Sequence, residues 1–254
     1  MSDNEGKSIS LVNLGSLTKP VDTATKGVVD GAGAFLSRVC LPAAEEFGLY
    51  LRDRISNWRA LNLAKVLKKT QAKLKSDYKE TPPKFILQFI EGASQEDGEE
   101  LQDIWANLLA SALDPEYKEG IRTAYIDIIQ QLEVVNVRVL SAIHSIFAER
   151  VRRSEQNRAS LIPYKPRIDK GEIMEEVGLS DETQYKTAVD NLIRLRCIET
   201  YAETKMIKTE TPGGYHFYET ATLDKGYEAV SMTALGEGFI KACTRQTRES
   251  IKTQ

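Results

Sequence analysis

Residues 169–201 have the sequence DKGEIMEEVGLSDETQYKTAVDNLIRLRCIETY, and this stretch decides the fold of the second half of the chain. Asp169 is placed to cap a short helix, and Gly178 follows that helix at the position where a left-handed residue ends one. Ser180 is placed to cap a longer helix. Residues 197–201 then have strand character. The longer helix has one apolar face, formed by Tyr185, Val189, Leu192 and Ile193.

The residues on either side of this stretch complete a recognisable order of elements. Upstream, Asn136 is placed to cap a helix. Downstream, Pro212-Gly213-Gly214 is a turn signal, and Tyr215–Tyr218 predicts the returning strand of a hairpin. Val230–Met232 predicts another short strand, and Thr233 is placed to cap a last helix. Helix, short helix, turn, helix and hairpin is the order of a winged helix, which the sequence therefore predicts for this half.

The first half of the chain predicts helices. A single stripe at three- and four-residue intervals contains Leu101, Ile104, Trp105, Leu108, Leu109 and Ala112. Ser94–Asp97 offers an N-cap and an acidic first turn for this helix, and Asp114-Pro115 ends it. We expect Trp105 and Leu109 to be core residues, so that truncating either one destabilises the fold.

The fold class that we expect is mainly α, with an N-terminal helical region followed by a C-terminal winged-helix-like α/β domain with a small β-hairpin. The domains that we expect are a mobile tail over residues 1–20, a helical domain over 21–135 that carries the W-A-N-L-L-A-S motif, and a winged-helix-like domain over 136–254. Neither a secretory signal nor an apolar run long enough for a membrane span is expected, which favours a cytoplasmic protein.

One helix, between Pro42 and Tyr78, has a strongly basic polar face. A solvated surface that packs its other side on the helix over 101–113 explains this face, and so does a docking surface for an acidic partner or for anionic lipid at the inner membrane. The segment over 84–119 is acidic, so the two elements are expected to pair their charges. The candidate interaction surface comprises Arg52, Lys65, Lys68, Lys69 and Lys73.

Few residues are suited to catalysis or to metal binding. The chain has 2 histidines and 3 cysteines, and none of them has the spacing of a zinc site or of a Cys-His pair. We interpret His144 as a partly buried structural residue and His216 as part of the hairpin. No phosphate-binding glycine loop is present. The sequence therefore predicts no catalytic residue, no metal and no cofactor. A hydrolase whose site is assembled from scattered acidic residues is the weakest hypothesis.

A winged helix raises the question of DNA binding. A DNA reader inserts the start of its recognition helix past two rows of phosphates. Here that start carries Asp181 and Glu182, and the net charge of the chain is −3. The one compensating basic patch contains Arg150, Arg152, Arg153 and Arg158. We therefore expect weak duplex binding that moderate salt abolishes, although a winged-helix DNA-binding regulator is the alternative to a protein-contact role.

Four stretches resemble the abortive-infection alpha family of bacteria. Ile104–Asp114 (IWANLLASALD) is similar to the family's most specific motif, with Leu113 in place of the usual Met. Ala124–Leu132 resembles the helix that follows. Gly48–Arg54 with Trp58-Arg59 is a loose match, and Met232–Cys243 is similar to the closing motif, with Met232 in place of Leu.

The resemblance implies a role in phage defence, in which the infected cell halts before progeny emerge. It supplies no catalytic residue or cofactor, so we expect a non-enzymatic protein. Its expected partners are an unidentified protein or phage trigger, with the inner-membrane surface as a second possibility.

Overall fold

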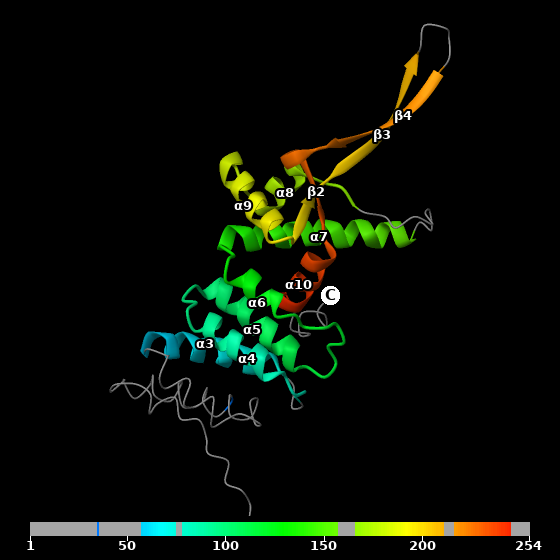
Figure 1. Ribbon diagram of the computed structural model, residues 1–254. Coiled ribbons are helices and arrows are strands. Elements are labelled where there is room, and N and C mark those ends of the chain that lie inside the picture. Colours follow the sequence, from blue (N-terminus) through cyan, green and yellow to red (C-terminus); the bar gives the residue numbers. More distant parts are fainter. Residues whose placement is uncertain (1–34, 36–56, 75–77, 157–165, 211–215, 245–254) are drawn as a thin grey trace, which may run out of the picture. The chain divides into compact units, whose positions relative to one another are not determined.

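The computed structural model describes residue 35 and residues 57–74, 78–156, 166–210 and 216–244 (Figure 1). The chain divides into two compact units. Unit 1 comprises Met1–Gln131 together with Ala242–Gln254, and unit 2 comprises Leu132–Lys241. The described residues are mainly helical with a small antiparallel sheet, which confirms the expected class at that level. Residues 1–20, Arg52, Arg158 and the 212–214 turn lie outside the described residues.

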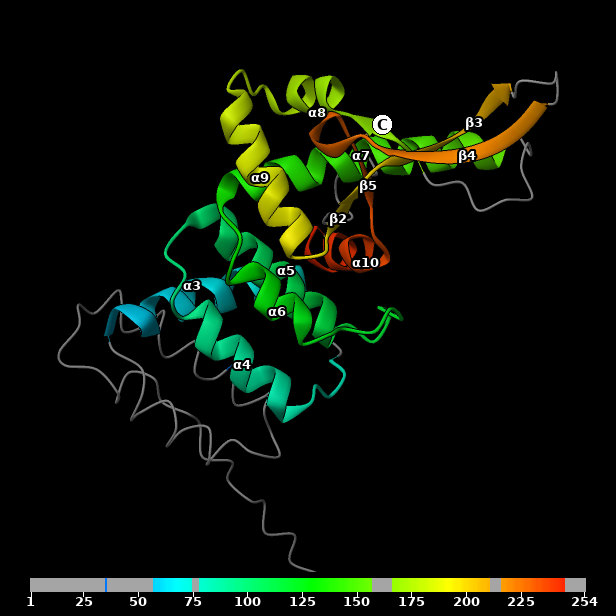
Figure 2. The ribbon, with the colours of Figure 1, turned by 45° about the horizontal axis from the view of Figure 1, so that its top comes forward.

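Unit 1 is built around one central helix. It contains α3 (Asn57–Lys73), α4 (Pro83–Ala93), α5 (Glu99–Leu113) and α6 (Ala124–Ile129), and α5 contacts the other three (Figure 2). From Leu101 to Leu113 every residue of α5 is buried except Asp103. A helix covered on several sides needs small or apolar residues all round rather than on one stripe, and Ala106, Ala110 and Ala112 meet that need.

The core of unit 1 is centred on Trp105, whose side chain is 1% exposed. Its ring meets the Phe89 ring edge-on, with the centroids 5.3 Å apart. Gly92 lies under the same ring, because a Cβ atom added there would come within 2.5 Å of it. Leu109 is also 1% exposed. The interpretation of Trp105 and Leu109 as core residues is therefore confirmed.

The start of α5 differs from the prediction. Its N-cap residue is Gly98, which has no side chain that could cap the helix. The Gly98 amide donates to the Glu96 carboxylate at 2.9 Å. Ser94 lies at the C-terminal end of α4, where its hydroxyl accepts from Arg59 Nη2 at 2.8 Å. Sequence alone did not reveal α4 as a helix, so Ser94 was wrongly assigned to the start of the next helix.

Unit 2 combines helices, a three-stranded sheet and a two-stranded hairpin. The helices are α7 (Val134–Gln156), α8 (Lys170–Val177), α9 (Glu182–Arg194) and α10 (Ala234–Cys243), whose last two residues fall in unit 1. The strands are β1 (Ile168–Asp169), β2 (Ile198–Thr200), β3 (Ala202–Glu210), β4 (His216–Asp224) and β5 (Ala229–Met232), with a 3₁₀ turn over Gly226–Glu228.

The three-stranded sheet is antiparallel in the order β1-β5-β2. Val230 lies opposite both Ile168 and Thr200, which places β5 in the centre. The β3–β4 hairpin is longer than the sequence predicted, because its register runs from Ala202 opposite Asp224 to Glu210 opposite His216. The many Thr, Glu and Lys residues in these strands weaken the apolar alternation by which strands are recognised.

Several helix ends in unit 2 test the predicted caps. Gly178 has φ = 71° at the end of α8, so its prediction is confirmed. The cap of α9 is Asp181, whose carboxylate accepts from the Thr183 amide at 2.8 Å, and not Ser180. Helix α7 begins at Val134, so Asn136 lies inside it. Asn136 Oδ1 accepts from the Glu133 amide at 2.8 Å, so its side chain satisfies a backbone donor at the start of α7 from inside the helix.

The start of α10 packs directly on the backbone of the α9–β2 junction. Thr233 caps the helix as predicted, because its Oγ1 accepts from the Gly236 amide at 3.0 Å. The same hydroxyl is within donating distance of two backbone carbonyls, that of Arg196 at 2.6 Å and that of Cys197 at 3.0 Å. A Cβ atom at Gly236 would lie 1.9 Å from the Cys197 carbonyl oxygen, so only glycine allows this approach.

Candidate functional site

The basic face of α3 is partly consumed by packing within unit 1. Lys69 Nζ lies 3.0 Å from Asp103 Oδ1 and 3.7 Å from Glu99 Oε1, and it donates to the Glu99 carbonyl at 3.1 Å. Arg59 is fixed in the same way, since its guanidinium donates to the Glu91 carbonyl at 3.0 Å. The expected charge pairing with the acidic segment is therefore confirmed at Lys69, where an exposed pair contributes about 0.2–1 kcal/mol.

Another side of α3 faces solvent. Lys65 and Lys68 are exposed, and Lys73 is half-buried. Trp58, the second residue of the helix, has 53% of its surface exposed, more than any other large apolar side chain in the described residues. The candidate interaction surface is thus divided: Lys69 turns toward α5, Lys65 and Lys68 face outward, and Arg52 lies outside the described residues. Apolar spacing along this helix predicted Trp58 on the same apolar face as Val66 and Leu67, but its side chain is exposed and lies seven residues from Lys65 on the outward face.

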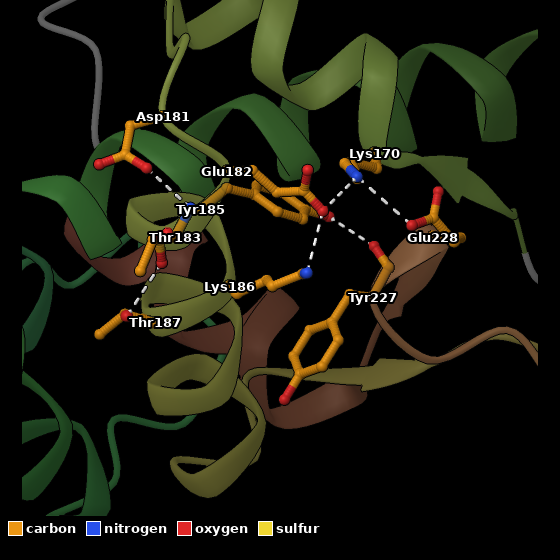
Figure 3. Close-up of polar contacts among 9 residues, drawn as sticks. All are labelled: Lys170, Asp181, Glu182, Thr183, Tyr185, Lys186, Thr187, Tyr227 and Glu228. Carbon is orange, nitrogen blue, oxygen red and sulfur yellow. Dashed lines mark hydrogen bonds and ion pairs between the residues drawn. The ribbon is translucent and has the colours of Figure 1, made fainter.

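The start of α9 carries a network of ion pairs (Figure 3). The Glu182 carboxylate lies 2.9 Å from both Lys170 Nζ and Lys186 Nζ. Lys170 also reaches the Glu228 carboxylate at 3.3 Å. Hydrogen bonds from Lys170 and then from Lys186 lower the pKa of Glu182 to about 2. The network therefore ties α8, α9 and the 3₁₀ turn together and keeps Glu182 ionised.

Two tyrosines extend this network. The Tyr185 hydroxyl donates to the Tyr227 carbonyl at 3.2 Å, and burial raises the pKa of Tyr185 to about 12. The Tyr227 hydroxyl donates to Asp190 Oδ1 at 2.6 Å. Lys186 Nζ lies 6.0 Å from the centroid of the Tyr227 ring. Sequence reasoning missed Lys170, Tyr227 and Glu228 in this site, because they are distant in sequence from the helix that they contact.

The arginines of α7 are also paired with carboxylates. Arg150 Nη2 lies 2.5 Å from Glu172 Oε2, on α8. Glu149 accepts from both Arg152 and Arg153, and these hydrogen bonds lower its pKa below the ordinary range. The basic patch that was expected to compensate for acids near DNA therefore has its charge offset by neighbouring carboxylates in the part of α7 that the structure describes.

The described cysteine and histidine side chains, which are the types best suited to catalysis, are buried or half-buried. Burial raises the pKa of the Cys197 thiol to about 12, which makes it a poor nucleophile. Cys243 is also buried. His144 is half-buried, and desolvation lowers its pKa despite the nearby Glu237 carboxylate. The described residues contain no group of three or more His, Cys, Asp and Glu side chains that could hold a metal ion.

The polar side chains of the W-A-N-L-L-A-S motif hold backbone groups. Asn107 Nδ2 donates to the Cys243 carbonyl at 2.8 Å, and Ser111 Oγ donates to the Ala242 carbonyl at 2.8 Å. Both residues are buried. They lie four positions apart on one face of α5, so together they satisfy carbonyls at the C-terminal end of α10, where intrahelical partners run out.

Comparison with known proteins gives one match. The family model described as abortive infection alpha matches residues 56–243, which is most of the chain. Neither the curated proteins nor the solved structures include a match. Among the described residues, no helix has both the length and the apolar character needed to cross a membrane. The matched region includes α5 with its motif, the ion-pair network and the closing α10 motif, and the chain therefore belongs to the abortive infection alpha family.

Proposed function

We propose that this protein acts in abortive infection, halting a phage-infected bacterial cell before progeny emerge, and that it does so by binding another macromolecule rather than by catalysis. The observation that carries this proposal is the role of Asn107 and Ser111. They are the polar side chains of the family's most specific motif, and they donate to backbone carbonyls of α10 instead of lining a reaction site. Holding the fold together in this way suits a protein that acts through its surface.

For unit 2 the proposal is a winged helix that contacts protein. The order α7, β1, α8, α9, β2, hairpin and β5 supports this fold, as does the central place of β5 in the sheet. In this arrangement α9 is the recognition helix. The start of α9 offers a partner both signs of charge, since Glu182 in its first turn pairs with Lys170 of α8 and with Lys186 one turn further along α9.

A winged-helix DNA-binding regulator is the alternative. The pairing of cations within unit 2 weighs against it, because a protein gains non-specific DNA affinity by placing free cations beside phosphates. Arg150 would have to give up Glu172, and Lys170 would have to give up Glu182 and Glu228. For the place of action we propose the cytoplasm, with the inner-membrane surface as a second location.

The proposal is tested by challenging bacteria that express the protein with phage and counting plaques. Expression of the natural sequence should lower plaque numbers relative to an empty vector. His144→Gln and Cys197→Ala, if they remain folded, should protect as well as the natural sequence. A folded variant of either kind that loses protection would indicate catalysis by that residue and would contradict the contact mechanism.

A further inference from the structure

The outward side of α3 presents a regular stripe of five residues. Trp58 and Lys65 lie seven positions apart, and Leu61, Lys68 and Ala72 continue the alternating three- and four-residue spacing. Trp58, Lys65, Lys68 and Ala72 are exposed, and Leu61 is half-buried. This is the spacing of the a and d positions of a coiled coil, which keeps one seam facing a partner helix. We call these five residues the α3 stripe.

The α3 stripe is held in place by contacts near both ends of the helix. Arg59 binds Ser94 and the Glu91 carbonyl near the start of α3, and Lys69 binds Glu99 and Asp103 near its end. The opposite side of α3 is packed into the core, where Leu63, Val66 and Leu67 are fully buried. Because the helix is fixed before binding, a partner does not have to supply the cost of ordering it.

From this arrangement we propose that the α3 stripe binds an acidic amphipathic helix of another protein. Trp58 and Leu61 form the apolar end, which suits a partner with an apolar anchor there. Lys65 and Lys68 lie about 10 and 15 Å along the helix axis from Trp58, at 1.5 Å per residue. They therefore suit carboxylates at those distances from the anchor on the partner helix. Ala72 lets the far end of the partner approach closely. Trp is one of the residue types enriched among those that dominate binding energy at protein interfaces.

Charge favours a narrow partner over a membrane plane. Glu99 and Asp103 lie beside Lys69, which directly follows Lys68, and the Glu99 side chain is 88% exposed. A flat anionic surface that met Lys65 and Lys68 would also meet these carboxylates, and their repulsion would offset much of the attraction. A helix is only about 10–12 Å wide, so it can lie along the stripe without covering the start of α5. This proposal deepens the proposed function and rests on it for the partner's biological role.

The first experiment replaces Leu61 with a photo-crosslinking phenylalanine analogue in the full chain. Cells are irradiated before and after phage infection, and the crosslinked peptide is sequenced. The proposal expects a peptide of another protein with acidic residues at three- or four-residue spacing. The double variant Lys65→Glu with Lys68→Glu should abolish the crosslink. The matched control, Lys84→Glu with Lys118→Glu, makes the same charge change at exposed lysines of unit 1 and should leave the crosslink intact.

The second experiment measures affinity with the crosslinked peptide made synthetically. Trp58 and Trp105 are the two tryptophans of the chain, and Trp105 is already buried, so a blue shift of the fluorescence on titration reports the covering of Trp58. Trp58→Ala should weaken binding by about 10- to 100-fold, measured by calorimetry, as expected for an interface hot spot.

Four outcomes would overturn the proposal. These are a crosslink to a second copy of the chain, a crosslink to another segment of the same chain, a crosslink that the Glu variants do not change, and the absence of any protein crosslink together with binding to vesicles of phosphatidylcholine and phosphatidylglycerol. If the natural sequence gives no phage protection while the crosslink is still found, the proposed function fails and the α3 stripe proposal stands.

Discussion

Substitution of Gly92 by Ala tests the account of the unit 1 core most sharply. In the structure, an added Cβ atom would lie 2.5 Å from Cη2 and 2.9 Å from Cζ2 of Trp105, and 2.9 Å from Gln130 Nε2. The amide of Gln130 is on an exposed residue and can move. The indole ring cannot move as easily, because it is 1% exposed and packed edge-on against Phe89.

The size of the effect follows from two opposing terms. Overpacking a core by one methyl group costs about 1–3 kcal/mol, and replacing a helical glycine by alanine recovers up to about 1 kcal/mol. Subtracting the second term from the first leaves about 0–2 kcal/mol, and the tightly packed ring puts Gly92→Ala in the upper half of that range, at about 1–2 kcal/mol. Trp105→Ala, which removes the ring altogether, should cost about 3–5 kcal/mol.

The double variant separates this explanation from a general loss of stability. Trp105→Phe removes the two ring atoms that the new Cβ would meet, so in that background Gly92→Ala should be neutral or stabilising. The expected coupling is at least about 1 kcal/mol, within the range found for residues in contact. Urea unfolding followed by circular dichroism measures all four proteins. If the losses of unfolding free energy of the two single variants simply add in the double variant, the reasoning is refuted. Additive losses would mean that the side chains at positions 92 and 105 do not compete for the same space.

Three further predictions concern single contacts. Gly236→Ala should destabilise the chain by about 3 kcal/mol or more, measured by urea unfolding, since its Cβ would overlap a backbone carbonyl oxygen; a loss below about 1 kcal/mol, the lower limit for overpacking a core, would contradict the packing of α10. Asn107→Ala should cost about 1–3 kcal/mol by leaving a buried carbonyl unsatisfied, and thermal unfolding with no change would show that water replaces the amide. The pKa of Glu182, about 2 against an ordinary 4.5, means that its ion pairs stabilise the fold above pH 4.5 and lose this effect as the pH falls toward 2. Lys170→Met should raise that pKa in an NMR titration, and an unchanged value would remove Lys170 as its main cause.

Local signals in the sequence predicted much of the helical framework. Gly178 adopts the left-handed conformation that its position at a helix end required. The stripe through Trp105 and Leu109 is in the core because apolar periodicity is a direct consequence of helix geometry. Asp114-Pro115 marked the end of α5 correctly, since α5 ends at Leu113.

Some helix starts were misplaced because residue types favoured at N-caps also occur beside or inside a helix. Ser180 and Asp181 are both good N-cap residues, and only the backbone geometry decides that Asp181 accepts from the Thr183 amide. Asn136 is also of a residue type favoured at N-caps, but the helix already begins at Val134, and the Asn136 side chain accepts from the Glu133 amide from inside it. Propensity alone cannot place a boundary more closely than this.

The candidate sites were harder to predict than the helices, because charge pairing depends on the fold. The sequence placed Lys69 with Lys65 and Lys68 on one basic face. Only the packing of α3 against α5 shows that Lys69 forms an ion pair with Asp103. Lys170 and Glu228 are 58 positions apart and meet only when α8 and the 3₁₀ turn are in place. No spacing rule in the sequence connects them.

The fate of infected cells tests the central claim most directly. Cultures that express the protein or carry an empty vector are infected so that every cell receives phage, and both surviving cells and released phage are counted over one infection cycle. Abortive infection predicts that the expressing cells stop growing or die while releasing far fewer phage than the vector cells. Expressing cells that survive and resume growth, or that release phage in the same numbers as the vector cells, would contradict the account.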